Sequence, residues 1–356
     1  LNKFNIMKRQ TIFLIITLLL WGAYYFAFKT PAEQAAQIAE VEEALKEKTE
    51  SFLGKDSEPT NDSVIAAISE DQVLSPVYVT EDRVIRYYSK SDARAYQIDP
   101  EGKNRRLFSG QDFPGLVSVA WSPDGNKAML KFKGEGGKNR FYYYDYNSKN
   151  KALLKDHMSS IVWMNNDRIF YKYYDSESRK DSLNIADPDG SNWKKVLDID
   201  QKDILISPVP KTGLISFWNT PSALTETSFQ IISLLGTESH MILSEKFGAD
   251  YLWNGDGTRA LVSHSDAKSG SKIRLASINS RGGEYQDLEV PTLVSKAIWS
   301  RDTKTVYYAL PLSIQDQVVM PDDYTNGKFN TADTFWKVDT DTGKKSRVVE
   351  LDKIIS

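Results

Sequence analysis

Four consecutive residues, Ser263-His264-Ser265-Asp266, have the side-chain types of a hydrolase triad. In such a triad a histidine takes the serine proton and an aspartate orients the histidine. Adjacent side chains on a strand point to opposite faces, so these four residues cannot converge on one substrate. The chain also has no Gly-x-Ser-x-Gly run, the motif that exposes a nucleophilic serine on a sharp turn. We therefore predict no catalytic residue and expect this segment to end a strand.

Histidines and acidic turns could instead bind a metal ion. The chain has three histidines and no cysteine, and His157 and His240 each stand alone in polar surroundings. Zinc sites need several such ligands together, so we expect no metal and no cofactor. Three Asp- and Gly-rich segments lack the ligand spacing and terminal glutamate of a calcium loop. We expect hairpin turns at all three: Asp187-Pro188-Asp189-Gly190, Asn254-Gly255-Asp256-Gly257 and Asp339-Thr340-Asp341-Thr342-Gly343.

A motif that recurs about every 43 to 46 residues must position all these side chains: an aromatic ending an apolar run, a polar turn, and a second strand-like run. The aromatic anchors are Tyr78, Trp121, Trp163, Trp253 and Trp299, with a degenerate copy at 205–213. A period in the forties with strand-like halves is typical of a β-propeller, one blade per repeat. We predict an all-β, six-bladed β-propeller of four-stranded blades over residues 73–356. We expect most of the anchors to pack between neighbouring blades.

The turn Trp121-Ser122-Pro123-Asp124-Gly125 resembles the recurring turn of WD40-like β-propeller repeats of the TolB type. The similarity covers roughly residues 73–351, and only this copy matches the turn in full. The resemblance implies the propeller fold. Because such propellers occur both as binding platforms and as domains attached to peptidases, it says little about function.

The sixth repeat carries an insertion near residues 311–333, where the other repeats have a short turn. Insertions into repeat proteins form loops on one face, often the binding face. We predict that this one binds a protein or peptide through apolar and acidic side chains: Val319, Met320, Asp322, Asp323, Tyr324 and Phe329. The alternative is that these residues fold back over the blade edge or the mouth of the central channel.

Residues 11–28 form an unbroken run without a charged side chain. At 1.5 Å per residue such a helix would be about 27 Å long, enough to cross a hydrocarbon core. Three basic residues precede the run and Lys29 alone follows it closely, so the positive-inside rule places the N-terminus in the cytoplasm. We predict a cytoplasmic stub and transmembrane anchor over 1–29, with the propeller in the periplasm or on the cell surface. A cleaved signal peptide is the alternative, although no small-x-small cleavage site follows cleanly.

Residues 30–72 are expected to form a helical stalk and linker. Thr30-Pro31-Ala32-Glu33 has the pattern of a capped helix start. Apolar residues then recur along a narrow seam within 33–52, which favours either a solvated stalk helix or a short coiled coil that dimerises weakly.

The charge balance, 45 basic against 48 acidic side chains, leaves no field for nucleic acid. The lack of cysteine excludes disulfides and thiolate chemistry. We therefore predict a membrane-anchored, extracytoplasmic propeller that acts as a protein- or peptide-binding scaffold in the cell envelope. The alternatives are a cell-wall or carbohydrate binder, and an enzyme (lyase, glycosidase or dehydrogenase) with a site in the central channel.

Overall fold

The computed structural model describes residues 67–235, 238–270 and 272–349. The predicted membrane anchor (11–28) and the predicted dimerisation segment (33–52) lie outside these residues. Within them, no helix combines the length and the apolar character needed to span a membrane.

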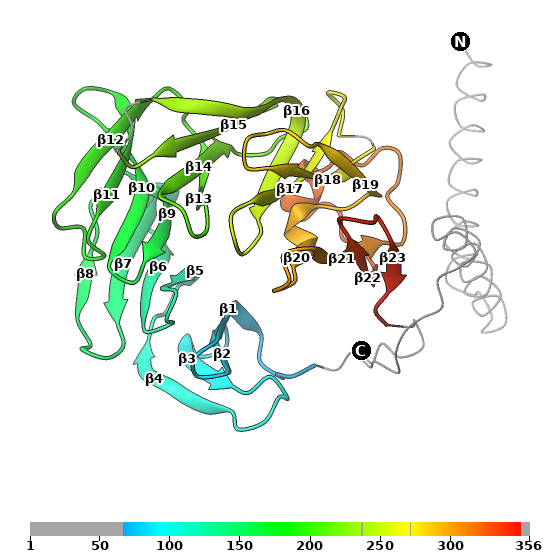
Figure 1. Ribbon diagram of the computed structural model, residues 1–356. Coiled ribbons are helices and arrows are strands. Elements are labelled where there is room, and N and C mark those ends of the chain that lie inside the picture. The colour runs from blue at the N-terminus through cyan, green and yellow to red at the C-terminus, as the bar shows by residue number, and fades with distance from the viewer. Residues whose placement is uncertain (1–66, 236–237, 271, 350–356) are drawn as a thin grey trace, which may run out of the picture. The chain divides into compact units, whose positions relative to one another are not determined.

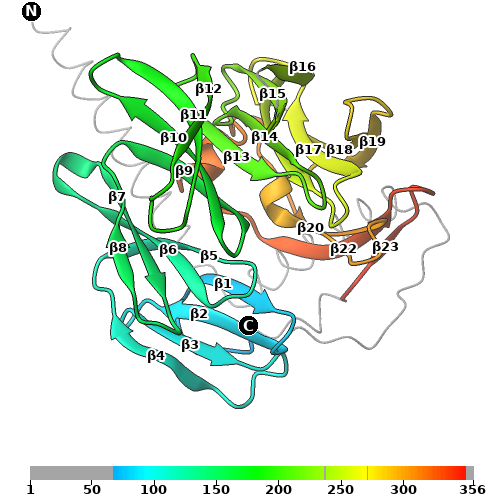
Figure 2. The same ribbon diagram turned by 60° about the vertical axis from the view of Figure 1, so that its left-hand side comes forward.

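The described chain is a succession of antiparallel sheets that follow one another in chain order along an arc (Figures 1 and 2). The first sheet contains β1 (Val73–Val79), β2 (Val84–Ser89), β3 (Arg94–Ile98) and β4 (Arg106–Asp112). The second contains β5 (Leu116–Trp121), β6 (Lys127–Lys133), β7 (Asn139–Asp145) and β8 (Lys151–Leu153). The third contains β9 (Met158–Asn165), β10 (Arg168–Asp175), β11 (Lys180–Ala186) and β12 (Lys194–Ile199).

The fourth sheet has seven strands: β13 (Ile204–Pro208), β14 (Leu214–Asn219), β15 (Glu226–Ser233), β16 (Ser239–Trp253), β17 (Arg259–Ser265), β18 (Arg274–Asn279) and β19 (Gln286–Val290). The fifth and last contains β20 (Ala297–Trp299), β21 (Thr305–Pro311), β22 (Asp333–Asp339) and β23 (Lys345–Arg347). Three short helices lie between strands: η1 (Glu135–Gly137), η2 (Val294–Lys296) and α3 (Asp322–Thr325).

The fourth sheet has seven strands instead of the expected four because β16 belongs to two repeats. Its first half pairs with β15, from Phe247 back to Ser239, and its second half pairs with β17, from Phe247 to Trp253. Counted by the repeat, the strands therefore form six units of four, with β16 shared by units four and five. Counted by hydrogen bonding, they form five sheets, so the number of six blades stays a prediction.

The repeated tryptophans tie each unit to the one before it. The indole Nε1 donates a hydrogen bond across the junction in four cases: Trp121 to Ser75 O (2.7 Å), Trp163 to Ala120 O (2.8 Å), Trp253 to Ser216 Oγ (2.8 Å) and Trp299 to Leu252 O (3.1 Å). A buried indole needs such a partner, because an unpaired buried donor is costly. These bonds confirm that the periodic tryptophans pack between neighbouring units.

The apolar core is a series of clusters, each shared by two successive units. Leu130 and Tyr144 of the second unit pack with Tyr88 of the first. Phe170 of the third unit packs with Phe217 of the fourth in the same way. Each sheet thus buries its apolar faces against its neighbours rather than around one common centre.

The loops divide between two ends of the sheets because successive strands run antiparallel. The loops joining the second to the third strand of each unit share one end with the connections between units. We call it the insertion end; it holds the loops 266–273 and 291–296 and the inserted segment 312–332. The turns 122–126, 254–258 and 300–304 lie at the opposite end.

Candidate binding site at the inserted segment

Two consecutive aspartates fix the inserted segment, one to the body of the protein and one within the segment itself. Asp322 accepts hydrogen bonds from Ser222 Oγ (3.0 Å) and from the backbone N–H of Ala223 (2.7 Å), about 100 residues earlier in the chain. Asp323 accepts one from the backbone N–H of Val319 (2.8 Å). The first aspartate therefore docks the segment, and the second fixes the turn that leads into α3.

Apolar side chains of the segment pack on the loops around β18 and β19. Met320 is only 1% exposed and lies in a cluster with Ile273 and Leu293. Tyr324 and Phe329 pack against the same cluster and are partly buried. The apolar side chains that made the segment conspicuous in the sequence are therefore buried or partly buried against the protein.

Gly270 allows its own backbone and that of Met320 to approach closely. Met320 N donates to Gly270 O (3.3 Å), and Gly270 adopts a positive φ of 67°. A Cβ at this position would lie 2.5 Å from Met320 O, well inside van der Waals contact. The close approach therefore depends on the missing side chain.

A buried lysine lies at the base of the segment. Lys296 Nζ, with its side chain 7% exposed, donates to Asp333 Oδ2 and Thr331 Oγ1 and lies 4.8 Å from the centre of the Tyr324 ring. The other oxygen, Asp333 Oδ1, is buried without a hydrogen-bond partner in the structure. Because the Lys296 ammonium makes all these contacts within the protein, we assign it to holding the segment.

A pocket of about 400 Å³ opens between the inserted segment and its neighbours. Three stretches line it: Gly270, Lys272 and Ile273; Pro291; and Ile314, Gln315, Asp316, Val318 and Met320. Ile273 and Met320 are buried in its lining and Ile314 and Val318 are half-buried, while Lys272 and Asp316 are exposed. Among the described residues, no ion pair involves either of these two charges. The arrangement suits an apolar side chain of a partner, flanked by one cation and one anion.

Of the six residues predicted to bind a partner, only Met320 lines this pocket. The other five make the internal contacts described above or lie half-buried beside them: Val319, Asp322, Asp323, Tyr324 and Phe329. Their role in binding stays a prediction. Lys272 and Pro291 could not have been found from the sequence, because neither belongs to the segment that breaks the repeat.

The triad-like residues end β17, as expected, and form a different cluster. His264 is buried, its Nε2 is hydrogen-bonded to the Tyr285 hydroxyl (2.6 Å), and its Nδ1 lies 3.4 Å from Asp266 Oδ1. Burial lowers the pKa of His264, and nearby Lys246 lowers it further. Lys246 Nζ also donates to Asp266 (2.7 Å). The buried histidine thus belongs to a polar cluster in which its Nδ1 has no hydrogen-bond partner.

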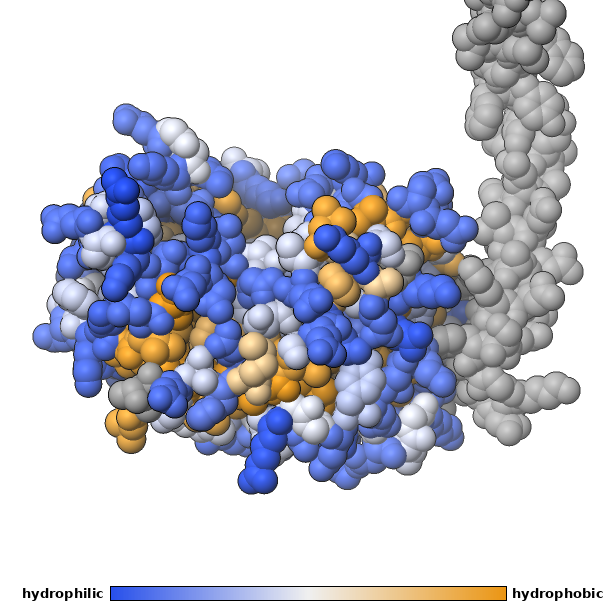
Figure 3. Space-filling model, turned by 90° about the horizontal axis from the view of Figure 1, so that it is seen from above, coloured by the Kyte–Doolittle hydropathy of each residue, from blue (hydrophilic) through white to orange (hydrophobic). Residues whose placement is uncertain are grey.

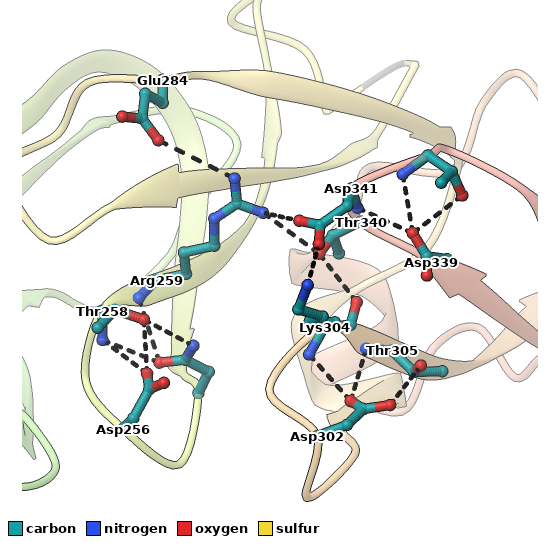
Figure 4. Close-up of polar contacts among 12 residues, drawn as sticks. Asp256, Thr258, Arg259, Glu284, Asp302, Lys304, Thr305, Asp339, Thr340 and Asp341 are labelled. Carbon is teal, nitrogen blue, oxygen red and sulfur yellow. Dashed lines mark hydrogen bonds and ion pairs between the residues drawn. The ribbon is translucent and has the colours of Figure 1, made fainter.

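The acidic segments at the opposite end are hairpin turns (Figure 4). Asp256 accepts hydrogen bonds from the backbone and hydroxyl of Thr258, and Asp339 accepts bonds from its own turn in the same way. Backbone N–H groups lower the pKa of Asp302 to about 2. Within the described residues, no group of three or more His, Cys, Asp or Glu side chains is arranged to hold a metal ion.

Arg259 joins these turns across the boundary between the fourth and fifth sheets (Figure 4). Its Nη1 donates to Thr340 Oγ1 (3.3 Å) and lies 3.6 Å from Asp341, which also pairs with Lys304 (2.6 Å). Because these charges pair with one another, we assign them to holding the two sheets together at the opposite end.

Exposed apolar side chains do not mark one face on their own. On the side seen in Figure 3 they reach the surface in several separate patches among hydrophilic residues. The pocket beside the inserted segment has two exposed charged residues, Lys272 and Asp316, in its lining.

No protein-family model matches the chain, and no curated protein matches it. Solved structures do. The β-propeller domain of the Trilobed protease from Pyrococcus furiosus, described as having an open velcro topology, has a TM-score of 0.50 at 12% identity, with 79% of this chain and 85% of that one covered. An oligogalacturonate lyase in complex with manganese has a TM-score of 0.51 at 11% identity, covering 68% of this chain and 75% of the lyase.

TolB from Acinetobacter baumannii is similar with a TM-score of 0.49 at 13% identity, over 79% of this chain. The chain spans only 64% of that structure's length. At these identities the likeness concerns the fold and leaves activity to the site. The described residues therefore have the WD40-like β-propeller fold that is found in TolB-type and related proteins.

Proposed function

We propose that this protein is a scaffold that binds a protein or peptide through the pocket at its insertion end. One observation carries the proposal: the roughly 400 Å³ pocket has an apolar lining and an unpaired charge of each sign at its edge. It is built from loops on a rigid array of sheets, which is how propellers and other scaffolds present variable recognition surfaces. An extended peptide could insert one apolar side chain and pair its own charges with Lys272 and Asp316.

The proposal includes six blades and attachment to a membrane. The six repeat units and the four equivalent tryptophan hydrogen bonds support the blade count. The uncharged run 11–28 supports a transmembrane anchor, and the basic residues before it support an extracytoplasmic propeller. The partner would then be a component of the cell envelope.

Site-specific photo-crosslinking in the native host tests the binding site. A photoreactive residue at Gln315, which lines the pocket, should crosslink a discrete partner. Reversing both edge charges with Lys272→Glu and Asp316→Lys should abolish that product at unchanged net charge. The matched control, Lys151→Glu with Asp203→Lys, reverses two exposed charges on other units and should leave the product intact. Loss in both variants, or no product from Gln315, would contradict the proposal.

The location is tested separately. A phosphatase that folds only outside the cytoplasm, fused after Ser356, should be active if the propeller is exported. Activity only for a reporter that works in the cytoplasm would reverse the assigned topology. Deleting residues 11–28 should release the protein from the membrane fraction if the anchor is retained.

A further inference from the structure

A second pocket, of about 550 Å³, lies where unit four meets unit five. Leu214, Ile231, Glu238 and Ile242 of unit four line it, together with Arg281 from the turn between β18 and β19. The first residue of β14, the end of β15 and this turn all lie at the opposite end of the sheets, far along the strands from the inserted segment. The volume is within the range of pockets that take small ligands, about 300–1,000 Å³.

The position of Leu214 carries a cation in units two and five, and that cation reaches the next unit. Lys127 Nζ donates to Asp167 of unit three (2.9 Å), and Arg259 Nη1 lies 3.6 Å from Asp341 of unit six. The backbone carbonyls of Lys127 and Arg259 each close the preceding turn, and in unit four the carbonyl of Leu214 makes the same bond. An apolar side chain cannot form the ion pair. At this junction a pocket therefore lies in the place of the tie.

The floor of the pocket is an extension of the apolar core. Ile231 belongs to the cluster that joins units four and five, and Leu214 and Ile242 are half-buried against that cluster. Cross-strand pairing of Leu214 with Ser233, and of Ile231 with His240, places these residues on one face of the sheet. The pocket therefore leaves apolar surface open to solvent, and a ligand gains free energy by covering it.

One cation and one anion lie at the rim. Arg281 and Glu238 are both exposed, and among the described residues neither takes part in an ion pair. Gly282, with a φ of 77°, brings the turn close to β16, since a Cβ there would lie 1.9 Å from Ile242 O. This approach holds Arg281 beside the pocket. Met241, which is 52% exposed, adds a flexible apolar side chain at the rim.

We propose that this pocket binds a short zwitterionic peptide with apolar side chains, of the size of a dipeptide. The planar guanidinium of Arg281 suits the terminal carboxylate, which it can bind with two parallel hydrogen bonds. The Glu238 carboxylate accepts hydrogen bonds from the terminal ammonium, and an apolar side chain covers Leu214 and its neighbours on the floor. The ligand bridges units four and five where other junctions have an ion pair. The site is independent of the pocket at the insertion end, so either can fail without the other.

Isothermal titration calorimetry of the full chain in detergent tests the ligand class, with L-leucyl-L-leucine as the probe. We expect saturable binding. Blocking the ammonium by N-acetylation, or the carboxylate as the amide, should each raise the dissociation constant by about tenfold or more, because each removes a charge-assisted hydrogen bond. No binding of the dipeptide, or equal binding of all three compounds, would overturn the proposal. Tighter binding of decanoate would assign the pocket to an anionic amphiphile and would also overturn it.

Substitutions test the site itself. Leu214→Lys restores the cation of the other units and should abolish binding, whereas the matched control Leu224→Lys, at an exposed leucine of the same unit, should leave it unchanged. Arg281→Gln should remove the preference for the free carboxylate over the amide, and Glu238→Gln the preference for the free ammonium. Thermal unfolding verifies that each variant is folded; if Leu214→Lys is not, the two rim variants decide. Unchanged preferences in both rim variants, or loss of binding in the control, would refute the assignment.

Discussion

Replacing Trp163 by phenylalanine tests whether the repeated indole hydrogen bond stabilises the array of sheets. Trp163 is buried among Met129, Ile161 and other side chains of units two and three, and its Nε1 donates to Ala120 O at 2.8 Å. Phenylalanine keeps an aromatic ring but removes the donor and part of the ring volume. The lost hydrogen bond should cost about 1 kcal/mol and the smaller ring about 1–2 kcal/mol. We expect the free energy of unfolding to fall by about 2–3 kcal/mol.

Urea denaturation followed by circular dichroism measures this loss from the midpoint and slope of the transition. Trp193→Phe is the matched control, because Trp193 is exposed and its ring contacts Lys155 Nζ at 5.0 Å, an interaction that phenylalanine keeps. It should change stability by less than about 0.5 kcal/mol. If the two substitutions cost the same, or if Trp163→Phe costs nothing, the assignment of the indole bond as a junction tie is wrong.

Three further substitutions probe other parts of the molecule. Gly270→Ala should lower stability by about 1–3 kcal/mol more than Gly136→Ala and expose the inserted segment to limited proteolysis, because both have a φ near 66° but only Gly270 has no room for a Cβ. Burial lowers the pKa of His264, so the folded protein favours the neutral ring; this contribution to the free energy of unfolding is present above the ordinary histidine pKa and is lost as the pH falls. His264→Gln should therefore make the free energy of unfolding depend less on pH between about pH 7.5 and pH 5. Lys172→Met leaves the largely buried carboxylate of Asp181 unpaired and should cost about 3–5 kcal/mol in thermal or urea unfolding, most of it recovered by adding Asp181→Asn.

The regular features of this fold were predictable because the same contacts recur in each repeat. A tryptophan at the end of an inner strand meets the preceding unit in every copy where it occurs, so one period determines many contacts. The acidic turns were predictable for a similar reason, since Asp256 and Asp339 satisfy the backbone of their own hairpins. Both features depend on interactions that are local or repeated.

The departures from the repeat were not predictable. Nothing in the residues around β16 announces that one strand serves two units, because that depends on the relative placement of units four and five. The inserted segment was visible as an interruption, but its docking on Ser222 joins residues 100 positions apart. The pairing of His264 with Tyr285 likewise crosses from one strand to another.

By itself the sequence determined that the chain is a repeated all-β protein, where its strands and turns fall, and which unit differs from the rest. A periodic pattern encodes these properties because each depends on contacts within a unit or with its neighbour in the chain. Only the tertiary structure decided that the insertion packs inward and leaves a pocket, and that Tyr78 and Ile298 stay exposed. Those outcomes depend on where distant units meet in space, and no spacing along the chain records that.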